Sequence, residues 1–336
     1  MNPRLSVVLP VFNRVALLAH PLKSLRAAVL AAPGLTWELV VVDDGSTEDV
    51  AAALAPYADL PVMLHRLPQN SGLLRARLEG LNRARGDAVF FLDADDAILP
   101  EKFTIQLDAL AHAEVVHGDM ARRVIDASGC ATGPLRLDSP SHPVAEPAAF
   151  YLTLQPAPHD PIFRRTYLQA AIGSPLCLPS RTYDSIAETW FYYHLALRPA
   201  RIVYCPGVYS IVGEPAGDRL SRRWERQCAA AVRLMEEFLR NCPGDDSSSA
   251  CRRRIGCCAF STWRALPTGF PPAHRLLAIW RQCPASPLTE LGGPTFARVA
   301  RLLGPVTAGR LFRLVQRPAY ARVRTTSDKE LRNLFA

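Results

Sequence analysis

The feature that most constrains the fold is a regular alternation of short apolar segments with helical ones in the N-terminal third of the chain. Residues 5–10, 37–43 and 88–92 are strand-length runs rich in Val, Leu and Phe. Such runs are typical of strands that are buried on both faces. Residues 15–32 and 71–85, which lie between them, carry apolar side chains at helical spacing. This alternation predicts an α/β fold: βαβ units in a mostly parallel, Rossmann-like sheet flanked by helices.

The chain of 336 residues is long enough for one large domain and a smaller region. Residues 183–197 predict a further helix, and beyond residue 220 the pattern is helical with polar breaks. We therefore expect an α/β domain over residues 1–215, divided into residues 1–120 and 121–215. A mainly helical C-terminal extension is expected over residues 216–336.

Charge is distributed unevenly between these two parts. Residues 1–215 contain 18 basic and 22 acidic side chains, a net charge of −4, whereas residues 216–336 contain 21 and 9, a net charge of +12. Within the basic part, residues 296–315 place apolar and Arg side chains at roughly helical spacing, interrupted at Gly304-Pro305. A basic amphipathic helix can lie on an anionic membrane surface, so peripheral membrane association is expected. The alternative is a helix packed on the main domain with its arginines in water.

Several classes of protein are disfavoured by what the sequence lacks. No apolar run approaches the roughly 20 residues of a membrane span, and Met1–Arg4 lead directly into a strand pattern without the apolar core of a signal peptide. The nine cysteines are scattered without a C-x-x-C pair, which favours reduced thiols in the cytosol. We expect a cytoplasmic protein, at the inner face of the cell membrane if the basic region binds there.

Carboxylates follow two of the predicted strands. Asp43 and Asp44 close the second apolar strand, and Asp93, Asp95 and Asp96 follow the run at residues 88–92. Ligands of open parallel sheets bind at the carboxyl ends of the strands, where five acids would repel one another unless a cation or hydrogen-bond donors relieved the charge. Oxygen ligands without matching His or Cys favour Mg²⁺ or Mn²⁺. The alternative is that these acids are helix caps and solvated turn residues.

The segment after the first strand excludes two nucleotide-binding classes. It reads Pro10-Val11-Phe12-Asn13-Arg14 in place of a Gly-rich phosphate loop, so a dinucleotide dehydrogenase or P-loop kinase is disfavoured. Ser46 lacks a G-x-S-x-G context, which disfavours a hydrolase.

Three motifs in order resemble a known family. They are LSVVLPVFNR at residues 5–14, ELVVVDDGST at residues 38–47 and FFLDADD at residues 90–96, with Asn70-Ser71-Gly72 and Ala76-Arg77 between the last two. Together they resemble the nucleotide-sugar half of the inverting family-two glycosyltransferases with the GT-A fold, over roughly residues 4–215.

The resemblance implies a donor site for a nucleoside-diphosphate sugar, with UDP-sugars favoured. Its donor-binding residues would be Pro10, Phe12, Asp44, Arg75, Arg77 and Asp93. Asp44 would accept a base N–H, Arg77 or Arg75 would lie near the diphosphate or base, and Asp93 would face the ribose. Asp95, with Asp96, would hold Mn²⁺ or Mg²⁺ on the diphosphate.

The acceptor half departs from the family pattern. Inversion needs a carboxylate that takes the proton of the attacking hydroxyl, and the family supplies it from an E-D-W-like motif. Alignment on the helix body, with His194 at the usual Arg position, makes Glu188 that carboxylate and keeps Asp184 as the alternative, while alignment on Trp190 places Thr189 there. Val212 occupies the position of a family His near the metal or diphosphate, so we expect either a metal ion with fewer protein ligands or Arg219 and Arg222 as phosphate ligands. His159 could contact the acceptor or the donor sugar.

The resulting functional prediction is a metal-dependent inverting glycosyltransferase. It would move the sugar to a hydroxyl of a glycan or lipid-linked acceptor, in bacterial surface or extracellular polysaccharide synthesis. A catalytically silent nucleotide-sugar-binding or scaffold protein is the alternative, motivated by Thr189 and Val212. A nucleotidyltransferase would normally show a Gly-rich loop after its first strand, and a nucleic-acid partner has only the basic C-terminal region to recommend it.

Overall fold

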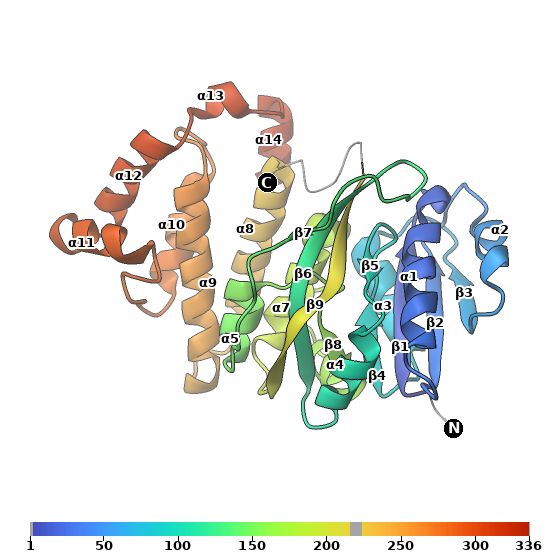
Figure 1. The fold of residues 1–336 in the computed structure, drawn as a ribbon. Coiled ribbons are helices and arrows are strands. Elements are labelled where there is room, and N and C mark those ends of the chain that lie inside the picture. Colours follow the sequence, from blue (N-terminus) through green and yellow to red (C-terminus); the bar gives the residue numbers. More distant parts are fainter. Residues whose placement is uncertain (1–2, 216–223, 336) are drawn as a thin grey trace.

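The computed structural model describes residues 3–215 and 224–335, so Arg219 and Arg222 lie outside the described residues. In this part of the chain nine strands form one sheet in the order β3-β2-β1-β4-β8-β6-β9-β5, with β7 paired to β6 (Figure 1). The strands are β1 (Leu5–Val11), β2 (Trp37–Asp43), β3 (Val62–Arg66), β4 (Ala88–Phe91), β5 (Ala97–Ile98), β6 (Val115–Ile125), β7 (Arg136–Leu137), β8 (Ile162–Arg164) and β9 (Ile202–Pro215).

The first four strands of that order are parallel, as the sequence predicted. β1 pairs with β2 and β4, and β2 pairs with β3, all in parallel register. Every residue of β1 and β4 is buried because helices cover both faces of the sheet. Val8 and Phe91 face one core, whereas Val7 and Phe90 face the other, as the two-residue period of a strand requires.

The second half of the sheet is mixed. β8 lies antiparallel between β4 and β6, while β9 runs parallel to β6 and antiparallel to β5. β5 and β8 were not predicted, because strands of two and three residues carry no detectable periodicity. The sheet is therefore parallel over β3, β2, β1 and β4 and mixed over β8, β6, β9 and β5.

The two faces of the sheet are covered by different helices. Apolar residues of α1 and α4 pack on one face, and those of α3, α6 and α7 pack on the other (Figure 1). The helices of this domain are α1 (Ala19–Leu30), α2 (Val50–Leu54), α3 (Leu73–Arg83), α4 (Lys102–Leu110), α5 (Pro147–Ala149), α6 (Arg165–Ile172) and α7 (Ala187–Leu195). The helix expected over residues 183–197 begins with a 3₁₀ segment, Arg181–Ile186, before α7.

The C-terminal part is helical, as predicted. It consists of α8 (Trp224–Asn241), α9 (Asp246–Ala265), α10 (Ala273–Gln282), α11 (Gly293–Leu303), α12 (Pro305–Gln316), α13 (Tyr320–Val323) and α14 (Asp328–Phe335). Its apolar residues belong to the same core as those of α3, α6 and α7. In Figure 1, α8 and α9 lie beside the sheet and α11 and α12 lie at the outer edge. Residues on both sides of position 215 therefore share one core.

All nine cysteines are free thiols, and burial raises the pKa of Cys251 and Cys258 well above the ordinary value. Within residues 3–215 and 224–335, no helix combines the length and the apolarity that crossing a bilayer requires.

Candidate active site

The acidic turn after β2 is held by contacts of the Asp43 carboxylate and by a close approach of Gly45 to a neighbouring segment. Asp43 Oδ1 accepts from the Ser46 N–H at 2.8 Å, and its Oδ2 lies 3.3 Å from Arg66 Nη1. Gly45 has φ +69°, and a Cβ there would lie 2.5 Å from the Gln69 backbone. Only glycine fits this turn without strain, because it must bend sharply against a neighbouring segment. Asp43, which is 1% exposed, therefore holds the turn and presents no charge to a ligand.

Asp44 joins β2 to the segment before α3. Its two carboxylate oxygens accept from the backbone N–H groups of Ser71 at 2.6 Å and Gly72 at 2.8 Å. Each oxygen keeps a second lone pair that can accept another hydrogen bond. Asp44 is 3% exposed, so a nucleotide base could reach it only at the edge of its carboxylate.

The residues around β1 divide into buried and exposed members. Pro10 is buried within the strand, whereas Phe12 is 46% exposed just after it. Phe12 is therefore not a core residue, and its ring is available to a planar ligand. Pro10 can act only by shaping the backbone beneath such a ligand.

Arg77 connects the donor and acceptor halves. Its Nη2 donates to both oxygens of Asp93 at 2.8 Å, and its Nη1 lies 3.6 Å from Glu188 Oε2. Burial would lower the pKa of Arg77, but the two carboxylates outweigh it and raise the pKa above its ordinary value. Arg77 is only 2% exposed and contacts Asp93 and Glu188, and its expected place near the diphosphate or base stays a prediction.

Arg75, the alternative to Arg77, lies on a different face of α3. Two residues along an α-helix correspond to a rotation of about 200°, and Arg75 is exposed where Arg77 is buried. Arg75 therefore lies on the solvent side of α3, away from the Asp93–Glu188 pair.

Both carboxylate oxygens of Asp96 contact groups of the protein. Its Oδ1 accepts from the Gly213 N–H at 2.9 Å, and its Oδ2 lies 2.6 Å from His159 Nδ1. Burial alone would lower the pKa of His159, but the Asp96 carboxylate outweighs it and raises that pKa. With exposures of 5% and 1%, Asp96 and His159 form a buried pair. The roles expected for Asp96 at the metal ion and for His159 at the acceptor or donor sugar stay predictions.

β9 presses closely on the same loop. A Cβ on Gly213 would lie 1.7 Å from the Asp95 carbonyl oxygen, so only glycine allows this approach. Val212, the position without the family His, is the residue immediately before Gly213. The departure from the family pattern therefore falls next to the acidic loop itself.

Asp95, which was predicted to bind a metal ion, is partly exposed, whereas Asp96 is buried. Among the residues that the structure describes, no three His, Cys, Asp or Glu side chains form a metal cluster. Mg²⁺ is usually bound through one or two carboxylates plus substrate phosphates. The residues present fit a metal ion that a nucleotide diphosphate helps to hold.

Asp184 and Glu188 have different surroundings. Asp184 Oδ1 accepts from the Leu74 N–H at 3.1 Å, at the start of α3. Burial raises the pKa of Asp184. Glu188 lies in the first turn of α7, and its side chain is 36% exposed. Asp184 therefore caps a helix, whereas Glu188 is open to an incoming group.

Three contacts in succession join the two halves of the site. They pair Asn70 with Arg181 (Oδ1 to Nη2, 2.6 Å), Leu74 with Asp184, and Arg77 with Glu188. Residues 70–77 and 181–188 therefore lie against each other along the whole length of the site.

The C-terminal helix α8 holds the acceptor segment from behind. Tyr183 donates to Glu237 at 2.6 Å, and Asn241 donates to the Leu176 carbonyl at 2.7 Å. Nothing in the sequence of α8 beyond its amphipathic pattern indicated this contact.

A second buried group was also missed. Lys102 Nζ donates to the Asp160 carbonyl at 2.7 Å and to Ser210 Oγ at 3.0 Å. Burial lowers the pKa of Lys102 to about 8 and raises the pKa of the Asp160 carboxyl to about 6. Lys102 is one of three lysines in a chain rich in Arg, which was the only available signal. The network is continuous with the His159–Asp96 pair, because Ser210 Oγ donates to the His159 carbonyl at 2.9 Å.

Residues 6–159 match the family model described as Glycosyl transferase family 2. An uncharacterized glycosyltransferase, YwdF of Bacillus subtilis, is 30% identical over 116 residues, which cover 34% of this chain and 41% of YwdF. The putative teichuronic acid biosynthesis glycosyltransferase TuaG of the same organism is 34% identical over 109 residues (32% and 42%). The undecaprenyl-phosphate 4-deoxy-4-formamido-L-arabinose transferase of Pseudomonas aeruginosa is 36% identical over 121 residues (34% of each chain). The chain thus matches less than half the length of these curated relatives.

Two solved structures share the fold. The crystal structure of S. aureus TarS 1-349 in complex with UDP-GlcNAc has a TM-score of 0.60 at 18% identity and covers 96% of this chain and 93% of that one. The mannosyltransferase PcManGT from Pyrobaculum calidifontis, in complex with GDP-Man and Mn²⁺, has a TM-score of 0.54 at 19% identity (94% and 88%). The GT-A fold and the family resemblance inferred from the motifs are confirmed.

Proposed function

We propose that this chain, whose residues 6–159 form a glycosyl transferase family 2 domain, transfers a sugar from a nucleoside-diphosphate sugar to an acceptor hydroxyl. The observation that carries the proposal is the Asp93–Arg77–Glu188 chain. It places a carboxylate of the acceptor half beside the acidic loop of the donor half. Glu188 lies beyond the residues that match the family, so its role rests on this geometry.

The proposed reaction inverts the anomeric carbon in one step. The acceptor hydroxyl attacks that carbon while Glu188 accepts its proton, and the bond to the nucleoside diphosphate breaks on the opposite side. Arg77 holds Glu188 in place, since its buried guanidinium attracts the carboxylate at 3.6 Å. Phe12 and Asp44 bind the base, and Asp93 faces the ribose.

The leaving diphosphate requires charge stabilisation. A Mn²⁺ or Mg²⁺ ion bound with the donor would neutralise the charge that develops there. Asp95 is the residue that would hold it, and the His159–Asp96 pair would keep the Asp95 loop in position.

The donor and acceptor classes follow from the relatives by analogy. TarS was solved with UDP-GlcNAc and PcManGT with GDP-Man, and we favour a UDP-sugar. The names of TuaG and of the undecaprenyl-phosphate transferase concern a cell-surface polymer and a lipid carrier. They support a glycan or lipid-linked acceptor, used in bacterial surface polysaccharide synthesis at the cytoplasmic face of the membrane.

Nucleotide binding provides the direct test. The protein should melt at a higher temperature with UDP and Mn²⁺ than with either alone, and Asp95→Ala should abolish the metal-dependent part. Asp108→Ala, a change in an exposed carboxylate that pairs with Arg4 at the N-terminal end of β1, is the matched control. No shift with UDP or with GDP, with or without Mn²⁺, would exclude the proposal.

One observation favours a second candidate, a silent nucleotide-sugar-binding protein. Val212 lies next to the acidic loop where the family has a His, and Asp96 is withdrawn into an ion pair. Such a protein would bind the nucleotide with Mn²⁺ but release no UDP from any UDP-sugar and acceptor pair.

A further inference from the structure

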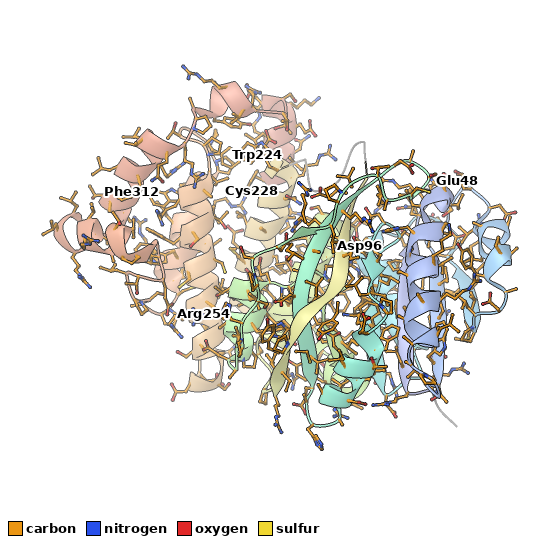
Figure 2. The ribbon with its side chains drawn as sticks, viewed as in Figure 1. Glu48, Asp96, Trp224, Cys228, Arg254 and Phe312 are labelled. Carbon is orange, nitrogen blue, oxygen red and sulfur yellow. The ribbon has the colours of Figure 1, made fainter. Side chains whose placement is uncertain are left out.

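Helices α11 and α12 expose an apolar surface. Leu302, Leu314 and Val315 are 85%, 71% and 87% exposed, and Leu303 and Leu311 are 49% and 45% exposed. These five residues are called the hairpin patch. The two helices lie at the outer edge of the helical region, on the side away from the sheet (Figure 1). In Figure 2, Phe312 marks α12 at the opposite end of the molecule from Glu48.

The inner side of this hairpin is firmly packed. Phe296 and Ala308 are fully buried, and the rings of Phe296 and Phe312 lie 5.7 Å apart. A Cβ on Gly309 would lie 2.3 Å from the Trp263 ring, so α12 and α9 are in close contact. The hairpin is therefore held by its inner face, and no residue of the hairpin patch belongs to the core.

The segment of chain that carries the hairpin patch has only basic charged residues. Residues 291–327 contain seven Arg and no Lys, Asp or Glu. Arg298, Arg301 and Arg310 are exposed, and none of residues 3–215 or 224–335 forms an ion pair with them. Elsewhere in the C-terminal region, arginines such as Arg253 and Arg275 pair with Glu290 and Glu236. The hairpin therefore combines exposed leucines with unpaired positive charge.

This combination selects one kind of partner. A second copy of the chain would bring seven further arginines to the same place, and like charges would repel. A nucleic acid would pair with the arginines but would leave the leucines in water. An anionic bilayer satisfies both, because phosphates attract arginines and the headgroup boundary accepts apolar side chains.

The length of the two helices determines how they could lie relative to a bilayer. Gly304 has φ +76° and separates α11 from α12, so they cannot form one long helix. At 12 residues, α12 is about 18 Å long, whereas the hydrocarbon core of a bilayer is about 30 Å thick. The hairpin can lie on a bilayer but cannot cross it.

We propose that the hairpin patch and its arginines dock the protein onto the surface of an anionic lipid bilayer. The leucines enter the headgroup boundary, and Arg298, Arg301 and Arg310 contact lipid phosphates. This goes beyond the proposed function, because it assigns a binding surface that the transfer reaction does not need.

Vesicle flotation with the full chain, without nucleotide, tests the proposal. The protein should float with vesicles of equimolar phosphatidylcholine and phosphatidylglycerol and remain unbound with phosphatidylcholine alone. The triple variant Leu302→Ser/Leu314→Ser/Val315→Ser should reduce binding by about tenfold or more, since it removes the inserted side chains. Arg298→Gln/Arg301→Gln/Arg310→Gln should reduce binding to the anionic vesicles similarly.

The matched control is Leu30→Ser/Leu137→Ser/Leu178→Ser, at residues that are 75%, 70% and 72% exposed outside the hairpin. It should bind vesicles as the wild type does. Equal loss in the control, or no binding by the wild type, overturns the proposal. So does a dimer in light scattering that the hairpin variant converts to a monomer, because a second copy would then occupy the patch.

The UDP and Mn²⁺ thermal shift separates this proposal from the proposed function. The hairpin variants should keep that shift, which also shows that they are folded. A wild type that floats but binds no nucleotide would refute the function and leave the docking surface intact.

Discussion

The two edges of the candidate site are built in different ways. On the donor edge, Asp44 and Asp96 each have both carboxylate oxygens engaged by backbone or side-chain groups. On the acceptor edge, Glu188 is 36% exposed, and its one ion-pair partner among the described residues is Arg77 at 3.6 Å. A donor edge fixed in advance suits a constant ligand such as a nucleotide. A less constrained carboxylate suits a base that must meet an incoming hydroxyl.

The largest effect is expected for Glu188→Gln on the acceptor edge. The amide keeps the size of the side chain but cannot accept the proton, so the rate of transfer should fall by about 100-fold to 10,000-fold. UDP release from a UDP-sugar and acceptor measures the rate, and the UDP and Mn²⁺ thermal shift should remain. Retained transfer would assign the proton to another group, first to Asp184.

Arg77→Met should affect both edges, since it removes the residue that joins them. Asp93, whose side chain is 23% exposed, would lose its guanidinium partner, and loss of a hydrogen bond to a charged group typically costs about 1.5–3 kcal/mol of unfolding free energy. Urea unfolding measures the loss. Arg75→Met, on the exposed side of the same helix, should change stability by less than about 0.5 kcal/mol. Equal losses of unfolding free energy in Arg77→Met and Arg75→Met would mean that the ion pairs of Arg77 do not stabilise the protein.

Acid should destabilise the protein through two buried histidines. Burial lowers the pKa of His194, in α7, and of His117, in β6, to about 4. His194 is neutral when folded, since its Nδ1 lies 2.7 Å from the Trp190 carbonyl and its Nε2 accepts from the Leu176 N–H. Their stabilising contribution is complete above pH 6.5 and is lost as the pH falls towards 4, by up to about 3 kcal/mol each.

Urea unfolding between pH 7 and pH 4 measures this loss. His194→Gln should reduce the pH slope, because the amide does not titrate, whereas His112→Gln at an exposed position should leave it unchanged. A slope that is the same in all three proteins would contradict the assignment to His194.

The smallest effect is expected for Asp184→Ala. The substitution removes the acceptor of the Leu74 N–H, and loss of such a cap costs about 1 kcal/mol. Transfer should persist at close to the wild-type rate in the UDP-release assay. A loss of transfer as large as that of Glu188→Gln would exchange the roles of the two carboxylates.

The donor half could be predicted because its signals are local. The apolar runs of β1, β2 and β4 and the acids that follow them lie within a few residues of each other, and parallel pairing brings their ends together. The acceptor half depends on contacts between distant segments. His159 meets Asp96 across 63 positions, and α8 meets Tyr183 across more than 50.

Pairs of this kind leave no periodicity and no spacing to detect. The sequence therefore grouped Asp96 and Arg77 in one candidate site, while their partners and burial became visible only in three dimensions. The exposed leucines of α12, by contrast, belong to a local pattern of apolar and basic residues that the sequence reveals. The break between α11 and α12 falls at Gly304-Pro305, as predicted.

The shared core across position 215 has a consequence for chimeric proteins. α8 contacts the backs of the segments that carry Asp184 and Glu188, so residues 121–215 cannot be transplanted into a homologue without the helices that follow them. A swap that ended at 215 would leave the faces of these segments that contact α8, including Tyr183, against a foreign helix. The unit that can be exchanged to alter acceptor choice is the acceptor half together with its C-terminal helices.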